Sequence, residues 1–138
     1  MENHSHTIKI NASPEKIFGI YSDVSNWKSW DSEVVSSSLD GPFKDGTFGS
    51  LKPKSGPKSK ILIETVIPNI SFCALSKLPL CVMRFGHDLE KAGDYTSVTH
   101  SLNFSGPLSF LFKRLIGNQI SKTIPHSLIG LKQKAERA

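Results

Sequence analysis

The sequence of 138 residues has no apolar run that approaches the roughly 20 residues needed to span a bilayer. Its first residues, MENHSHTIKI, lack the basic start and apolar centre of a secretory signal. We therefore expect a cytoplasmic protein. Only two cysteines are present, Cys73 and Cys81, and their spacing fits neither a metal site nor a redox pair. In a reducing compartment we expect two free thiols.

Acidic residues are scarce in the second half of the chain. Residues 70–138 carry nine Lys or Arg but only four Asp or Glu, which accounts for the whole net charge of +5. There is no aromatic-studded basic motif of the RNA-binding kind, so we expect no nucleic-acid partner. The stretch SFLFKRLI, residues 109–116, mixes apolar and basic side chains as segments that touch a membrane surface transiently do. The alternative is a core helix with a solvated basic edge.

What is present fits one domain, which we expect to span residues 1–138. Residues 8–12 alternate apolar and polar side chains, as a half-buried strand does. Ser13 can then cap a helix whose first residue is Pro14. The pattern predicts two short helices directly after this first strand.

Residues 31–104 contain about six further strand-like segments separated by turn residues, among them Gly93-Asp94, which suits a two-residue type II′ hairpin. From Leu108 to Leu131 apolar residues recur at helical spacing. Pro125 lies inside this helix, where it should kink it or split it in two. The order predicts an α+β fold, in which a curved antiparallel sheet of about seven strands wraps a long C-terminal helix and leaves a cavity between them.

Two stretches carry a resemblance to a known family. INASPEKIFGIYSDVSNWKSWDSEV, residues 10–34, and RFGHDLEKAGDYTSVTHSLNFSGPLSFLF, residues 84–112, resemble the opening and closing segments of the polyketide cyclase/dehydrase and lipid-transport superfamily, which has the START-like or helix-grip fold. The resemblance implies this fold and a site for an apolar molecule, which some members bind and others transform. Fold alone does not fix the activity.

The hairpin at Gly93-Asp94 places two histidines on one face of the sheet. Side chains alternate along a strand, so His87 shares a face with its apolar neighbours two and four residues away, and so does His100. With a two-residue turn, paired residue numbers sum to 187 and His87 lies opposite His100. A sum of 185 also aligns the apolar faces but sets the histidines diagonally.

These histidines have two interpretations. They orient a ligand or act as an acid–base pair beside a carbonyl group, or they are core histidines satisfied by backbone, a tyrosine or water. No third ligand of suitable type lies near them in the sequence, so we expect no metal, and we expect no cofactor.

Trp27 and Trp30 are three residues apart and should project from one face of the second short helix. We expect Trp27 to plug the helix pair against the sheet and Trp30 to line the cavity; the alternative is that both are plugs. Asp31 either terminates this turn or acts as a general base at the cavity mouth.

The closing helix adds a stripe at i, i+4 and i+8 that should face the sheet. The residues that we expect to contact a ligand, from this stripe, the sheet and the tryptophan turn, are Trp30, Phe72, Met83, Phe85, His87, His100, Leu102, Phe112, Ile116 and Ile120.

Three functions are compatible with these features. The first is a non-enzymatic carrier or sensor of a small hydrophobic molecule, lipid-like or polyketide-like, which the absence of a complete catalytic set favours. The second is a cyclase or dehydratase that uses His87 or His100 to move a proton. The third is a protein-interaction module that uses the basic helix or an exposed sheet edge.

Overall fold

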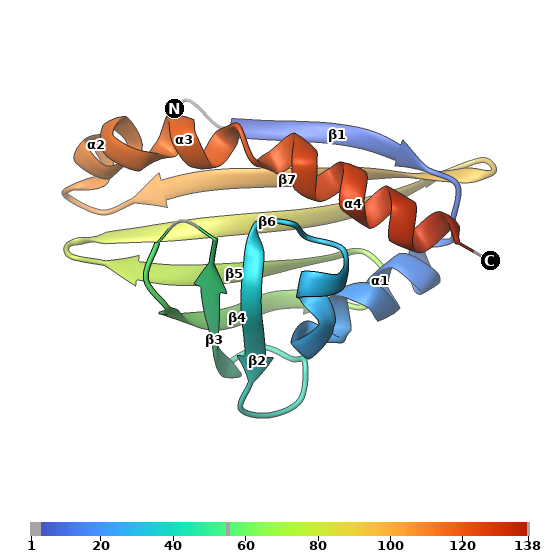
Figure 1. The fold of residues 1–138 in the computed structure, drawn as a ribbon, viewed down its shortest axis with the longest axis horizontal. Helices are drawn as coiled ribbons and strands as arrows, with labels where there is room; N and C mark the ends of the chain where they lie inside the picture. Colours follow the sequence, from blue (N-terminus) through green and yellow to red (C-terminus); the bar gives the residue numbers. More distant parts are fainter. Residues whose placement is uncertain (1–3, 55, 138) are drawn as a thin grey trace.

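Seven antiparallel strands form one open sheet in the computed structural model, which describes residues 4–54 and 56–137 (Figure 1). The order across the sheet is β1-β7-β6-β5-β4-β3-β2. The first two strands therefore occupy opposite edges, and the segment between them must cross the sheet. The strands are β1 (His4–Ile10), β2 (Val34–Leu39), β3 (Phe48–Pro53), β4 (Ser59–Ile67), β5 (Ser71–Leu78), β6 (Cys81–Ala92) and β7 (Tyr95–Ser105).

The crossing segment consists of α1 (Pro14–Ser22) and the 3-10 helix η1 (Val24–Ser29). The Ser13 hydroxyl accepts a hydrogen bond from the Lys16 N–H at 3.1 Å, and Pro14 opens the helix, where its missing N–H costs nothing. Both predicted short helices are therefore confirmed. Their buried side chains, Trp27 among them, pack toward the sheet, and the buried Trp30 follows η1 directly.

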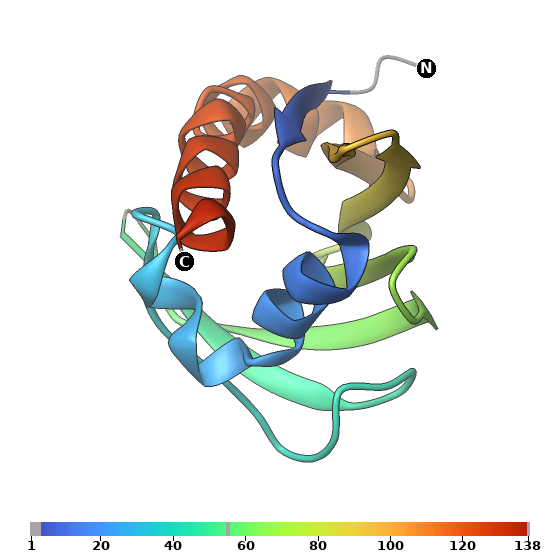
Figure 2. The same ribbon diagram turned by 90° about the vertical axis from the view of Figure 1, so that its right-hand side faces the viewer.

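The C-terminal helical region has four parts: α2 (Ser109–Phe112), the π-helical turn η2 (Lys113–Gly117), α3 (Asn118–Ser121) and α4 (Ile124–Glu136). Pro125 lies in the first turn of α4, so the predicted helix is indeed split in two at residues 122–123. The sequence pattern did not predict the π turn. Figure 2 shows the sheet curving around α4 and α1, which lie on its concave side.

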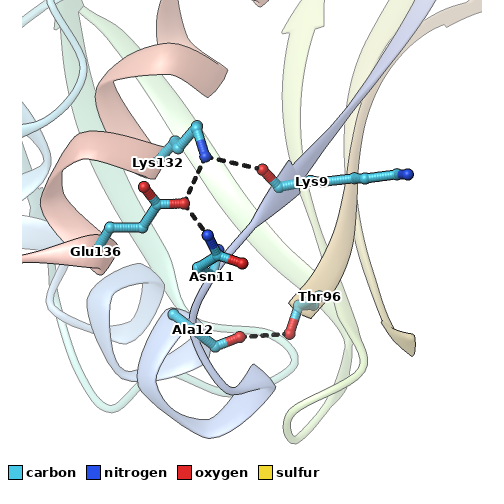
Figure 3. Close-up of polar contacts among 6 residues, drawn as sticks. All are labelled: Lys9, Asn11, Ala12, Thr96, Lys132 and Glu136. Carbon is cyan, nitrogen blue, oxygen red and sulfur yellow. Dashed lines mark hydrogen bonds and ion pairs between the residues drawn. The ribbon is translucent and has the colours of Figure 1, made fainter. Parts of the chain in front are cut away.

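The end of α4 is tied to the β1 edge (Figure 3). The Glu136 carboxylate accepts a hydrogen bond from the Asn11 N–H at 2.8 Å and pairs with Lys132 one turn back. The Lys132 ammonium also donates to the Lys9 carbonyl at 3.2 Å. These contacts hold α4 to the sheet at the end farthest from α2 and α3.

The β6–β7 hairpin has the predicted two-residue turn. Ala92 pairs with Tyr95, and Gly93 takes a φ of +67°, which the first central position of a type II′ turn requires. Residue numbers across the ladder sum to 187, so His87 lies directly opposite His100. Of the two registers left open by the sequence, this is the one observed.

The two cysteines point to opposite faces of the sheet. Cys81 is buried, whereas Cys73 is half-buried between the inward-facing Phe72 and Ala74. Both thiols are free, as predicted.

Candidate functional site

A cavity of about 420 Å³ lies between the concave face of the sheet and the helical region. Its sheet wall comes from β2 to β7, with Ala74, Met83 and Phe85 of β5 and β6 among its residues, and Ile116 and Ile120 belong to η2 and α3 on the helical wall. Most of the lining side chains are apolar. This volume is within the range of small-molecule sites in proteins.

Seven of the ten predicted contact residues line this cavity. Phe72, Leu102 and Phe112 do not: Phe72 and Leu102 are completely buried in the core, and Phe112 packs against it. Sequence periodicity gives the face of a strand but not whether a residue ends beneath the cavity floor or on its surface. The predicted residues that line the cavity are Trp30, Met83, Phe85, His87, His100, Ile116 and Ile120.

The two histidines lie side by side at the inner end of the cavity. Their ring centroids are 4.7 Å apart in an edge-to-face arrangement. The Tyr21 hydroxyl from α1 is hydrogen-bonded to His100 Nε2 at 2.7 Å. The ring of Phe72 stacks flat on His87 with 4.0 Å between centroids. His87 and His100 are therefore held in fixed positions by an aromatic cluster.

Burial keeps both imidazoles uncharged at neutral pH. Loss of solvation lowers the pKa of His87 to about 4, although the polar backbone of Phe72 acts in the opposite direction. Burial, and then the neighbouring His87, lower the pKa of His100 well below its ordinary value. Burial also raises the pKa of Tyr21 well above its ordinary value. The inner end of the cavity is thus polar but carries no charge.

Two buried polar atoms at the wall have no hydrogen-bond partner within the part of the chain that the structure describes. They are Nδ1 of His87 and Nε1 of Trp30. Unpaired buried polar atoms are uncommon because each costs the free energy of its lost hydration. His100, in contrast, matches the expectation of a core histidine satisfied by a tyrosine.

Both tryptophans line the cavity, so the expected division between them is only partly correct. Trp27 does act as a plug, because its indole N–H donates to the Tyr21 carbonyl at 2.8 Å and the ring packs beside Phe72. It also contributes surface to the cavity wall. Trp30 lies on that wall as predicted, with its ring 6.4 Å from that of Trp27 between centroids.

Asp31 closes the tryptophan turn and links it to α4. Its Oδ1 accepts hydrogen bonds from the Glu33 N–H at 3.0 Å and from the Ser127 hydroxyl at 2.8 Å. Burial raises the pKa of the Asp31 carboxyl, while these two hydrogen bonds lower it. The hydrogen bond from the Glu33 N–H gives Asp31 the turn-terminating role expected from sequence. The Asp31 side chain also lines the cavity.

Tyr21 and Ser127 are two polar site residues that sequence reasoning missed as participants. Both lie on the buried faces of helices, and the helical spacing of the buried residues could be seen in the sequence. Their partners, His100 and Asp31, are 79 and 96 residues away in the sequence. No local pattern indicates a contact over such a separation.

Within residues 4–54 and 56–137, no three His, Cys, Asp or Glu side chains gather as metal ligands do. Over the same ranges, no helix has the length and apolar character needed to cross a membrane.

The sequence matches the family described as polyketide cyclase/dehydrase and lipid transport over residues 1–136. The chain belongs to this family. A search of curated proteins finds no significant match.

Solved structures agree on the fold of this family member. A protein from Thermus thermophilus has a TM-score of 0.74 at 18% identity, with 97% of each chain covered. A START superfamily protein from Mycobacterium smegmatis gives 0.73 at 17% identity, also with 97% of each chain covered. A hypothetical protein from Helicobacter pylori gives 0.77 at 13% identity, with 98% of this chain and 88% of that chain covered. The START-like helix-grip fold predicted from sequence is confirmed.

Proposed function

We propose that this protein binds a small, uncharged, largely apolar molecule in the cavity between the sheet and the C-terminal helices, as a carrier or sensor. The observation that carries the proposal is the cavity itself, about 420 Å³ with a mainly apolar wall. Membership of a family that includes lipid transport supports it.

The charges around the cavity favour an uncharged ligand. Among the described residues that line it there is no Lys or Arg, whereas Asp31 and Glu33 contribute carboxyl groups. The two imidazoles are neutral for the reason given above. A buried anion would have no countercharge in such a site, and burying an unpaired charge is costly. Fatty acids and other anions are therefore disfavoured.

The contact residues in this proposal are the apolar wall and one polar end. Phe85, Ile116 and Ile120 supply apolar surface, and the imidazole of His87 supplies a polar group on the same wall. A ligand with a hydroxyl or carbonyl oxygen at one end matches this distribution.

Native mass spectrometry of the protein purified from its own host tests the proposal. Solvent extraction then identifies anything released. We expect an apolar adduct of one molecule per chain. A clean apo mass from several preparations, together with no change in tryptophan fluorescence on titration with a panel of neutral apolar compounds, contradicts a carrier function. Fluorescence is a direct readout because Trp27 and Trp30 both line the cavity.

One observation favours a second function, a cyclase or dehydratase. His87 is neutral and lines the cavity, two features of a general base. On the compound identified by extraction, His87→Gln should then abolish turnover while leaving affinity within a few-fold of wild type. If affinity and turnover fall by the same factor, His87 only binds the ligand.

A further inference from the structure

The segment formed by α2, η2 and α3 has an exposed apolar outer face. Phe110 is 69% exposed and Leu115 62% exposed, with Leu111 beside them. Leu80, in the β5–β6 turn, is 66% exposed and adjoins this segment, because its carbonyl accepts a hydrogen bond from the Leu108 N–H at 3.0 Å. Large apolar side chains gathered in this way on a surface usually mark a contact with a partner or a membrane. We call these four side chains, Leu80, Phe110, Leu111 and Leu115, the apolar edge.

The helical segment that carries most of the apolar edge has charges of one sign. From Tyr95 to Ala135 the sequence contains no Asp or Glu. Arg114 lies between members of the apolar edge and is exposed, and Lys122 is exposed at the end of the same segment. A surface that combines inserted apolar groups with flanking cations complements an anionic lipid layer.

The opposite face of the same segment forms part of the cavity wall. Ile116 and Ile120 line the cavity, and Gln119 and Thr123 do so near the break before α4. Figure 1 shows α2 and α3 at one end of the sheet, whereas α4 runs along it toward the edge where Figure 3 shows its anchoring contacts. Whatever contacts the apolar edge therefore lies against one wall of the cavity.

We propose that the apolar edge docks on the surface of a membrane that contains anionic phospholipid. The segment α2–η2–α3 then lies between the bilayer and the cavity. A second copy of the chain is a poor occupant, because two such faces would bring Arg114 and Lys122 against their own copies. The apolar edge is also small, and four side chains are suited to shallow insertion between lipids. This proposal goes beyond ligand binding and is tested without any cavity ligand.

Co-sedimentation with vesicles tests the docking. The wild-type protein is mixed with vesicles of phosphatidylcholine alone, or of equal parts phosphatidylcholine and phosphatidylglycerol. We expect binding to the anionic vesicles that weakens as salt is raised, and little binding to phosphatidylcholine. Phe110→Ser combined with Leu115→Ser should reduce binding to the anionic vesicles at least about tenfold. Arg114→Gln should reduce it about fivefold, which is what one basic residue near an anionic surface contributes.

The matched control removes two other exposed apolar side chains. Ile67 and Ile70, 46% and 53% exposed, flank the β4–β5 turn at the other end of the sheet. The double variant Ile67→Ser with Ile70→Ser should bind vesicles as the wild type does. Because all four substituted residues are exposed, each double variant should unfold at about the wild-type urea concentration.

Three results overturn the proposal. The first is no binding to anionic vesicles, and the second is equal loss in the Ile67/Ile70 control. The third is a concentration-dependent dimer that the Phe110/Leu115 substitutions dissociate, which makes the apolar edge an interface between copies. A failed docking test leaves the extraction experiment untouched, so the two proposals fail separately.

Discussion

Tyr21 is the residue that joins the first helix to the histidine pair. Its hydroxyl is hydrogen-bonded to His100 Nε2 at 2.7 Å, and both side chains are buried. Tyr21→Phe leaves that nitrogen without its partner and should lower the free energy of unfolding by about 1–3 kcal/mol in urea titrations of the apo protein. Tyr95→Phe, at a half-buried position of the β6–β7 turn, is the matched control and should change it by less than about 0.5 kcal/mol. Equal losses would mean that the Tyr21–His100 bond adds no net stability.

The pKa of His87 predicts that acid destabilises the fold. The folded-state value of about 4 is below the ordinary value of about 6.5. Above about pH 6.5 both states are neutral, and below it the unfolded chain takes up a proton that the folded chain refuses until about pH 4. His87 alone should therefore cost about 2 kcal/mol of unfolding free energy between about pH 7 and about pH 5.

Urea titrations at the two pH values measure this slope in the wild type, His87→Gln and His126→Gln, the last at an exposed position of α4. The His87 variant should lose about 2 kcal/mol less than the wild type, and the His126 variant should match the wild type. The raised pKa of Asp31 acts in the opposite sense, since it favours folding as pH falls, but all three proteins contain Asp31 and its effect cancels. A common slope in all three would show that the fold does not hold His87 neutral.

For single residues, the sequence predicts contacts between side chains that a turn brings together. It misses contacts that depend on where a helix is placed. Gly93-Asp94 limits the β6–β7 register to two choices, and the observed one sets His87 opposite His100. The orphaned His87 Nδ1 and the Tyr21–His100 bond depend on how closely α1 approaches the sheet, which no local spacing specifies.

Among the elements, α4 approaches the chain after η1 closely at one glycine. A Cβ on Gly130 would overlap the backbone carbonyl of Trp30. Gly130→Ala should therefore lower the free energy of unfolding by about 2–3 kcal/mol, although alanine itself favours a helix, and it should alter tryptophan emission. Gly19→Ala is the matched control in α1, where a Cβ meets nothing within 4 Å, and it should raise stability by about 0.5–1 kcal/mol. Unchanged stability in the Gly130 variant would mean that α4 can shift away without cost.

The sequence predicted element types better than their ends or helix subtype. β7 alternates buried and half-buried residues from Thr96 to Phe104, which is why its strand pattern was clear. The end of β3 is one boundary that the residue pattern did not predict, because the strand continues to Pro53, a last position where a missing N–H is tolerated. The π turn η2 has the same apolar stripe as an α-helix and ends at Gly117, which packs on the ring of Phe104. Periodicity alone does not separate the two helix types.

Across the whole molecule, the cavity is the place where a ligand can add stability. Protein interiors pack with few spaces larger than a water molecule, so an apolar wall of this extent offers dispersion contacts that a bound molecule can make. A cavity of about 420 Å³ is large in comparison. A molecule that binds only the folded state adds stability that grows with its concentration, by about 2.7 kcal/mol at a hundredfold excess over Kd.

A larger side chain that projects into the cavity should take the place of a ligand and reduce the stabilisation that the ligand provides. Ala74 lies on the sheet wall and is nearly fully buried, so Ala74→Phe places a ring where a ligand would lie. We expect its apo stability to equal or exceed that of the wild type, and we expect the compound recovered by extraction to raise its Tm much less than it raises the wild-type Tm. Ala92→Phe, at the end of β6 and outside the cavity, should keep the full ligand-induced rise. If Ala74→Phe keeps it too, the stabilising ligand does not occupy the space beside Ala74.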